Sequence, residues 1–202
     1  MTKSAILPDF SIESRFMGQV CGIDEAGRGP LAGPVVAAAV ILDRLDTPVG
    51  INDSKTLVRS KRELLFKRII ATSQVGVGFA SVEEIDKINI LNATMAAMER
   101  AVVELASAPN VALVDGNRVP KLSCATYPVV GGDRRSLSIA AASIVAKVTR
   151  DHLMMKLSIA HPGYGWDRNV GYGTEEHMEA LSSLGVTPHH RKSFSPVNRT
   201  SR

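Results

Sequence analysis

The fold is best predicted from the stretch Val20-Cys21-Gly22-Ile23-Asp24-Glu25-Ala26-Gly27-Arg28-Gly29-Pro30, where an apolar run meets two acids and a glycine-rich turn. The apolar residues predict a core strand that ends near Asp24. Carboxylates are rarely buried without a partner, so acids at the tip of such a strand most often bind a metal, pair with a cation or transfer protons. The Gly27-Arg28-Gly29 turn adds bare backbone and one guanidinium, which suits close approach to a phosphate. A capped turn or a structural ion pair would explain the same two acids.

Two further acids lie at similar places downstream. Asp115 ends the apolar run 111–114, and Asp133 follows two glycines just before an alanine-rich segment. In open α/β sheets, ligand sites form outside the carboxyl ends of the strands, so Asp24 and Asp115 are expected to converge if their strands are adjacent and parallel. An all-oxygen cluster suits Mg²⁺ or Mn²⁺ better than zinc.

Length and composition predict one main α/β domain. The chain has 202 residues and is 45% hydrophobic, enough for a substantial core. Its longest apolar stretch, near 35–42, is too short to span a bilayer, and residues 1–8 lack the apolar core of a secretory signal. Cys21 and Cys124 show no metal-ligand spacing and are expected to be core thiols. These features favour a cytoplasmic protein.

The net charge of +4 is modest, but the segment 187–202 carries no acid. Its basic residues could contact phosphates, although a charged, solvated terminus is the commoner explanation. They are Arg191, Lys192, Arg199 and Arg202.

The pattern of apolar residues predicts alternating strands and helices. We expect strands at 20–24, 35–42, 74–81, 111–114 and 125–130, and helices at 60–70, 89–106, 136–157 and 175–184. Ser81 and Glu84 have capping-box spacing. Residues 1–18 are expected to form an arm of uncertain order, and 161–174 a loop.

Six ordered motifs make the sequence resemble the bacterial ribonuclease HII family. The resemblance covers about residues 20–197 and implies a ribonuclease H-like α/β domain at 19–157, with a mixed five-stranded sheet flanked by helices and a C-terminal helical extension at 158–202. It also implies an endonuclease that cuts the RNA strand of RNA–DNA hybrids and incises at single ribonucleotides in duplex DNA. The motifs are Gly22 to Val35, Asn52-Asp53-Ser54-Lys55, Val114-Asp115-Gly116, Gly132-Asp133, Ala140 to Asp151 and Gly171-Tyr172-Gly173-Thr174.

The resemblance assigns four acids, Asp24, Glu25, Asp115 and Asp133, to catalysis and to binding two Mg²⁺ or Mn²⁺ ions, with Asp24 as the bridging ligand. Such hydrolysis would leave 3′-hydroxyl and 5′-phosphate ends. Asp151 is an alternative fourth acid, although its position after Arg150 also fits an ion pair on a helix surface.

The resemblance assigns recognition of the ribonucleotide junction to Gly27, Arg28, Gly29 and Tyr172. From the residues alone, Tyr172 would be a turn-packing side chain. Three cations, Lys55, Lys147 and Arg150, are candidate phosphate contacts. Lys55 could equally be a loop charge, and the other two could neutralise the acids. His161, His177, His189 and His190 form no zinc pattern and are expected to be surface or loop residues.

Three other readings compete. The glycines at 27, 29 and 33 could suggest a nucleotide-binding kinase or dehydrogenase. Their spacing fails the phosphate-loop and dinucleotide fingerprints, and the segment leads into a strand instead of a helix. A junction resolvase or integrase-like nuclease would use the same metal chemistry, and a non-enzymatic nucleic-acid-binding module would leave the acids structural. We expect a monomer, and the sequence holds no signal that identifies a replication-clamp partner.

Overall fold

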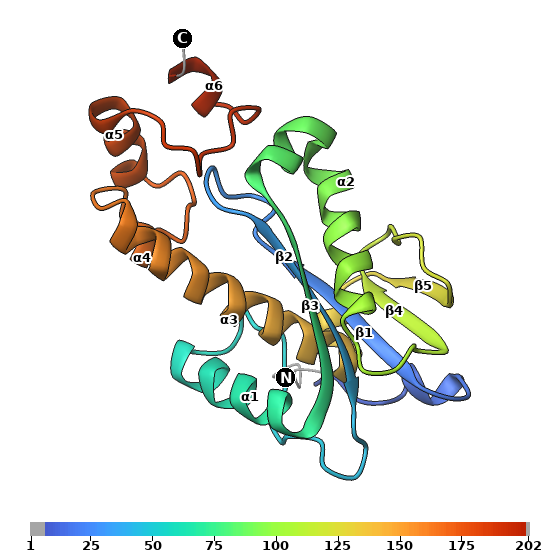
Figure 1. The fold of residues 1–202 in the computed structure, drawn as a ribbon. Coiled ribbons are helices and arrows are strands. Elements are labelled where there is room, and N and C mark those ends of the chain that lie inside the picture. Colours follow the sequence, from blue (N-terminus) through green and yellow to red (C-terminus); the bar gives the residue numbers. More distant parts are fainter. Residues whose placement is uncertain (1–6, 201–202) are drawn as a thin grey trace, which may run out of the picture.

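The computed structural model describes residues 7–200 as a mixed five-stranded sheet between helices (Figure 1), which confirms the predicted fold class. The strand order is β3-β2-β1-β4-β5, in which β1 pairs antiparallel with β2 and parallel with β4. The strands are β1 (Val20–Ala26), β2 (Val35–Leu42), β3 (Ser73–Ala80), β4 (Val111–Asp115) and β5 (Ala125–Val129).

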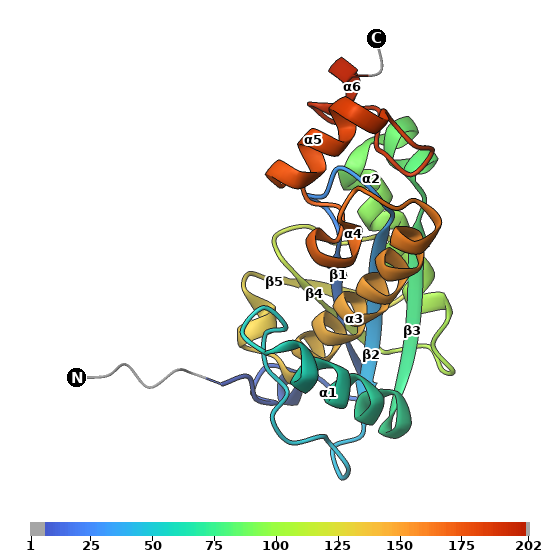
Figure 2. The same cartoon turned by 90° about the vertical axis from the view of Figure 1, so that its left-hand side faces the viewer.

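The helices cover both faces of this sheet and one of its ends (Figure 1, Figure 2). They are α1 (Arg59–Thr72), α2 (Val82–Val103), α3 (Leu137–Ala160), α4 (Trp166–Asn169), α5 (Glu175–Leu184) and α6 (Val197–Thr200), with 3-10 turns η1 (Glu13–Arg15) and η2 (Gly132–Arg134). Within residues 7–200, no helix combines the length and hydrophobicity that a membrane crossing requires.

Strand β2 is buried along its whole length because each of its faces is covered by a different helix. Val35, Ala37, Ala39 and Ile41 belong to the core under α2, whereas Ala38, Val40 and Leu42 belong to the core under α3 and α1. This explains why the strand reads as one continuous apolar run instead of an alternating one.

Two contacts between strands and helices depend on glycine. A Cβ atom on Gly22 would lie 2.1 Å from the main-chain carbon of Ser138, so only glycine lets β1 approach the start of α3 this closely. A Cβ on Gly76 would lie 2.0 Å from the carbonyl oxygen of Ala101 in α2. Helix α3 is therefore held against the strand that carries Asp24.

Helix α2 begins with the predicted capping box, in which Ser81 Oγ accepts from Glu84 N–H at 3.2 Å and Ser81 N–H donates to Glu84 at 3.0 Å. It is kinked at Asn89, whose φ is 67°, where a separate helix was predicted to begin. Met98 of α2 and Leu105, just after the helix ends, are buried in the core between this helix and the sheet.

The N-terminal segment is more ordered than predicted. Residues 1–6 lie outside the described residues, but Ile12 is buried and Asp9 forms a β-bridge with Ser136. The buried Glu13 carboxylate accepts from Ser136 Oγ at 2.7 Å and from Ser138 N–H at 2.9 Å. The segment therefore caps the start of α3 instead of forming a free arm.

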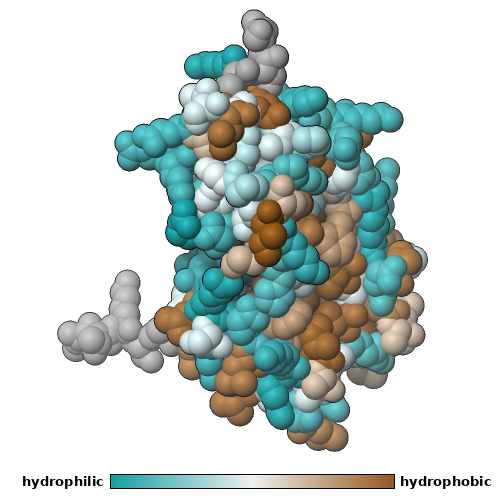
Figure 3. Space-filling view, turned by 60° about the vertical axis from the view of Figure 1, so that its left-hand side comes forward, coloured by the Kyte–Doolittle hydropathy of each residue, from teal (hydrophilic) through white to brown (hydrophobic). Residues whose placement is uncertain are grey.

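The C-terminal elements α4, α5 and α6 lie beyond the end of α3, at one end of the sheet (Figure 1). The space-filling view shows mainly hydrophilic and neutral residues over this end and more hydrophobic residues toward the α1 end (Figure 3). The β1–β2 loop, residues 27–34, faces the C-terminal elements, because Leu31 N–H donates to Gly171 O and Arg191 N–H to Leu31 O, each at 2.8 Å.

Candidate active site

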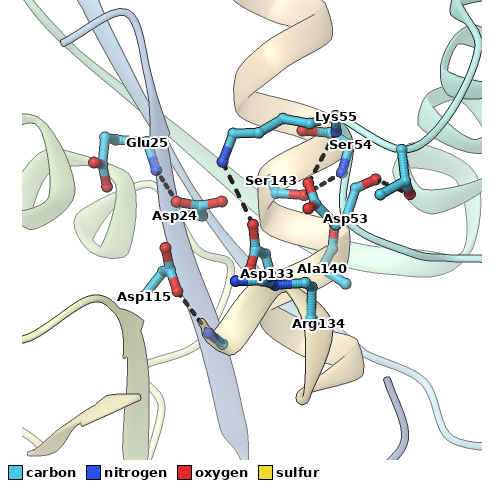
Figure 4. Close-up of polar contacts among 12 residues, drawn as sticks. Asp24, Glu25, Asp53, Ser54, Lys55, Asp115, Asp133, Arg134, Ala140 and Ser143 are labelled. Carbon is cyan, nitrogen blue, oxygen red and sulfur yellow. Dashed lines mark hydrogen bonds and ion pairs between the residues drawn. The ribbon is translucent and has the colours of Figure 1, made fainter. Parts of the chain in front are cut away.

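Three acids converge at the carboxyl ends of β1 and β4 (Figure 4). Because Ile23 of β1 pairs with Val114 of the parallel β4, the residues that follow, Asp24 and Asp115, are neighbours. Asp133 reaches the same point from η2. One carboxylate oxygen of each acid lies within 4.8 Å of those of the other two. The predicted convergence of Asp24 and Asp115 is confirmed.

Main-chain donors orient two of these carboxylates. Glu25 N–H donates to Asp24 Oδ1 and Gly132 N–H donates to Asp115 Oδ1, both at 2.7 Å. The second bond joins the end of β4 to the turn that carries Asp133. Two carboxylates of the triad are therefore fixed by main-chain donors.

The electrostatics of the triad favour a bound cation. Burial, followed by the charges of Glu25 and Asp115, raises the pKa of Asp24 well above its usual value. Burial and Asp115 likewise raise the pKa of Asp133. Oxygen ligands gathered in a small, buried volume are the donor set that hard divalent cations prefer. The residues present therefore fit a Mg²⁺ or Mn²⁺ site.

Glu25 stands beside the triad and is not part of it. Its carboxylate lies 3.3 Å from Arg28 Nη1. Burial raises the pKa of Glu25, although the Arg28 charge acts in the opposite direction. The structure thus brings three of the four predicted acids to one point and places the fourth next to them.

Lys55 and Lys147 each lie against a different acid. Lys55 Nζ is 3.5 Å from Asp133, and Lys147 Nζ is 2.8 Å from Asp151. Partial burial acts to lower the pKa of Lys55, but the nearby carboxylates of Asp133 and Asp24 outweigh it and raise that pKa. Asp133 has a carboxylate oxygen within 4.8 Å of those of Asp24 and Asp115, whereas Asp151 pairs with Lys147 outside this group, so the geometry favours Asp133 as the acid that joins them.

A pocket of about 300 Å³ opens beside Asp24 and Glu25. Gly29 lies against the Tyr172 ring, since a Cβ on Gly29 would be 3.3 Å from Tyr172 Cε1. The Tyr172 side chain is 48% exposed. The pocket is lined by Arg150 and by the six other residues predicted to bind substrate, namely Gly27, Arg28, Gly29, Lys55, Lys147 and Tyr172.

Two serines of the quoted motifs, Ser54 and Ser143, line the same pocket, although the sequence assigned them no role in binding substrate. Ser54 N–H donates to Ser143 Oγ at 3.3 Å, and Lys55 N–H donates to Asp53 Oδ1 at 2.9 Å. These bonds tie the Asn52-Asp53-Ser54-Lys55 loop to α3 and present Lys55 to the acids. The motif itself was visible in the sequence and pointed to this loop.

The prediction that Arg150 contacts phosphate is wrong, because its side chain is only 2% exposed. It donates to the carbonyl oxygens of Pro34 at 3.0 Å, Ala32 at 3.0 Å and Val170 at 2.9 Å. Burial lowers its pKa to about 10. Arg150 therefore joins the β1–β2 loop to the backbone at Val170.

Arg191 was grouped with a solvated terminus, and this prediction is also wrong. Its guanidinium is fully buried and donates to the carbonyl oxygens of Gly27 at 2.5 Å, Arg28 at 2.9 Å and Gly33 at 2.8 Å. Burial, followed by the charge of Arg150, lowers its pKa to about 9. Arg202 of the same predicted group lies outside the described residues.

Two of the histidines predicted at the surface are also buried. His177 and His190 have no exposed area, and their Nε2 atoms lie 3.0 Å apart. Polar side chains that bond to backbone or to each other in the core leave no local sequence pattern, which is why sequence reasoning missed them.

Comparison with known proteins identifies the family. A family model described as Ribonuclease HII matches residues 21–197. The Ribonuclease HII of Paramagnetospirillum magneticum is 58% identical over 95% of this chain and 97% of its own length.

Two solved structures resemble the fold. The ribonuclease H2 from Pyrococcus horikoshii OT3 is 27% identical, with a TM-score of 0.76 over 90% of this chain and 96% of that one. Bst-RNase HIII in complex with Mn²⁺ is 19% identical, with a TM-score of 0.71 over 100% of this chain and 75% of that one, and it shows the fold alone. The matched family, the fold and the acid triad agree, and the chain belongs to the ribonuclease HII family of enzymes, which degrade the RNA of RNA–DNA hybrids.

Proposed function

We propose that this enzyme incises duplex DNA at single embedded ribonucleotides, in addition to cutting the RNA strand of hybrids. One observation carries the proposal: the pocket beside Asp24 and Glu25 is walled by the Gly27-Arg28-Gly29 turn and Tyr172. Its small volume, about 300 Å³, suits one sugar and its phosphates more than a long stretch of strand.

Divalent ions fit the acid triad described above. Asp24, Asp115 and Asp133 would hold Mg²⁺ or Mn²⁺, and Glu25 lies beside them. Bound ions would activate the attacking water and neutralise charge on the phosphate and the leaving oxygen, giving 3′-hydroxyl and 5′-phosphate ends.

The protein's own groups select ribose. The 2′-hydroxyl distinguishes RNA from DNA locally, and main-chain groups of Gly27 to Gly29 can approach it because glycine has no side chain. The exposed Tyr172 ring can stack on the sugar while its hydroxyl donates a hydrogen bond. Lys55 and Lys147 line the same pocket and would contact the flanking phosphates.

Cleavage of one duplex sequence in three forms tests the proposal. The forms are all-DNA, DNA with one ribonucleotide, and an RNA–DNA hybrid, each with Mg²⁺, Mn²⁺ or a chelator. We expect cleavage of the second and third forms, only with a divalent ion, and product ends that carry 3′-hydroxyl and 5′-phosphate. Cutting of the all-DNA duplex, or 2′,3′-cyclic phosphate ends, would contradict the proposal.

A further inference from the structure

Beyond the catalytic pocket, two buried histidines form a chain of hydrogen bonds that ends on the Tyr172 backbone. His177 Nδ1 lies 2.9 Å from the Tyr172 carbonyl oxygen, and His177 Nε2 lies 3.0 Å from His190 Nε2. Trp166 Nε1 donates to His177 Nε2 at 3.1 Å, and Thr187 N–H donates to His190 Nδ1 at 3.0 Å.

The partners assign the proton on each ring. A carbonyl oxygen only accepts, so His177 carries its hydrogen on Nδ1, and its Nε2 is left as the acceptor that the indole N–H requires. The Thr187 N–H only donates, so His190 Nδ1 is an acceptor and its hydrogen sits on Nε2. His190 Nε2–H therefore donates to His177 Nε2.

The chain has one direction and contains two neutral rings. It runs from Thr187 through His190 and His177 to the carbonyl of Tyr172. Burial lowers the pKa of both histidines, that of His190 to about 4, which keeps both rings neutral near pH 7. An added proton on His177 Nε2 would face two donors, Trp166 Nε1–H and His190 Nε2–H, and would break the chain.

Arg191, the residue after His190, supports another wall of the pocket, the Gly27–Gly29 turn. Arg191 donates to the carbonyl oxygens of Gly27 and Arg28, as described above. We call His189–Arg191 the anchor segment. Its backbone bonds to the β1–β2 loop as well, because Gly33 N–H donates to His189 O at 2.8 Å. The Gly27–Gly29 turn and the Tyr172 loop are thus both fixed to the anchor segment.

We propose that His177 and His190 are positioning residues for ribonucleotide recognition, which hold Tyr172 at a fixed distance from the Gly27–Gly29 turn. The inference rests on the proposed function, because it concerns the pocket assigned to ribose. A side chain about 1 Å out of place can cost on the order of 100-fold in rate, so a loosened Tyr172 carbonyl should be measurable.

Substitution of His177 by two residues of similar shape separates the hydrogen bond from packing. His177→Asn keeps an N–H near the Tyr172 carbonyl, whereas His177→Leu has the same branching and no donor. We expect His177→Leu to lower kcat/KM on the single-ribonucleotide duplex at least about 10-fold, mainly in kcat. His177→Asn should stay within about threefold of the unmodified enzyme. Equal losses in the two variants would overturn the proposal.

A double-mutant cycle with Tyr172→Ala shows whether His177 acts through Tyr172. The two substitutions should be non-additive, so that His177→Leu adds little once the tyrosine ring is gone. Additive losses would mean that His177 supports only the fold. The Mn²⁺ requirement should be the same in all variants, and a shifted requirement would also count against the proposal.

A second pair of variants tests the proposal even if His177→Leu does not fold. His190→Gln can place an amide donor near the Nε2 position, and His190→Asn places its amide near Nδ1, where it cannot reach His177. The first should retain more single-ribonucleotide cleavage than the second, and the reverse order would overturn the proposal. Loss of ribonucleotide incision in the unmodified enzyme would instead sink the proposed function.

Discussion

The ionised form of Asp24 is disfavoured in the absence of metal, since burial and the charges of Glu25 and Asp115 raise its pKa in the folded state. A raised pKa means that the folded state binds the proton more tightly than the unfolded state does. Stability is therefore lost as pH rises from the ordinary aspartate range through the raised pKa. At pH 7, above the ordinary pKa of aspartate, this shift therefore destabilises the metal-free fold, and a bound cation would relieve the loss.

Asp24→Asn should therefore abolish activity and stabilise the metal-free protein. We expect cleavage to fall by more than about 100-fold, because a ligand charge is lost. In a chelator at pH 7, the melting temperature should rise above that of the unmodified enzyme. Added Mn²⁺ should raise the melting temperature of the unmodified enzyme by more than that of the variant. A variant that retains full activity would refute the assigned site, and one that melts lower would refute the electrostatic account.

At the level of elements, the contact between β1 and the start of α3 links the fold to the triad. Gly22→Ala places a Cβ 2.1 Å from the Ser138 backbone, and Asp133 lies in the turn just before α3. We expect a loss of about 1–3 kcal/mol in the free energy of unfolding, measured in urea, together with a lower specific activity of the folded enzyme.

Gly76→Ala is the matched control, because its Cβ would collide with the backbone of α2 at 2.0 Å, on the other face of the sheet. It should lose a similar amount of stability while the folded enzyme keeps its specific activity. If both variants kept the same specific activity, α3 would not transmit the displacement to Asp133.

The helices and strands were largely predictable from the sequence, whereas the buried side chains that support the site were not. Helix α5 has its predicted bounds, and β2 was readable as an apolar run, because these signals are local. The meeting of Asp24 and Asp115 followed from parallel neighbouring strands. Arg150 bonds to Pro34 O, 116 positions away in the chain, and Arg191 to Gly27 O, 164 positions away, and such bonds depend on tertiary structure alone.

At the scale of the whole molecule, a net charge of +4 and the pocket lysines predict salt-dependent binding of nucleic acid. The logarithm of the binding constant for a labelled hybrid should fall linearly with the logarithm of salt concentration, through counterion release. Lys55→Ala should reduce that slope by about 1, whereas Lys67→Ala, on the exposed face of α1, should leave it unchanged. A salt-independent binding constant would contradict binding through phosphate contacts.

The place of Trp166 gives the enzyme an internal spectroscopic reporter. It is the single tryptophan of the chain, its side chain is fully buried, and its indole N–H is bonded to His177. Excitation at long ultraviolet wavelengths therefore selects one fluorophore, two hydrogen bonds away from the carbonyl of Tyr172. Its emission can report in real time on the surroundings of His177 and the Tyr172 backbone as an unlabelled duplex binds, with no dye attached to either molecule.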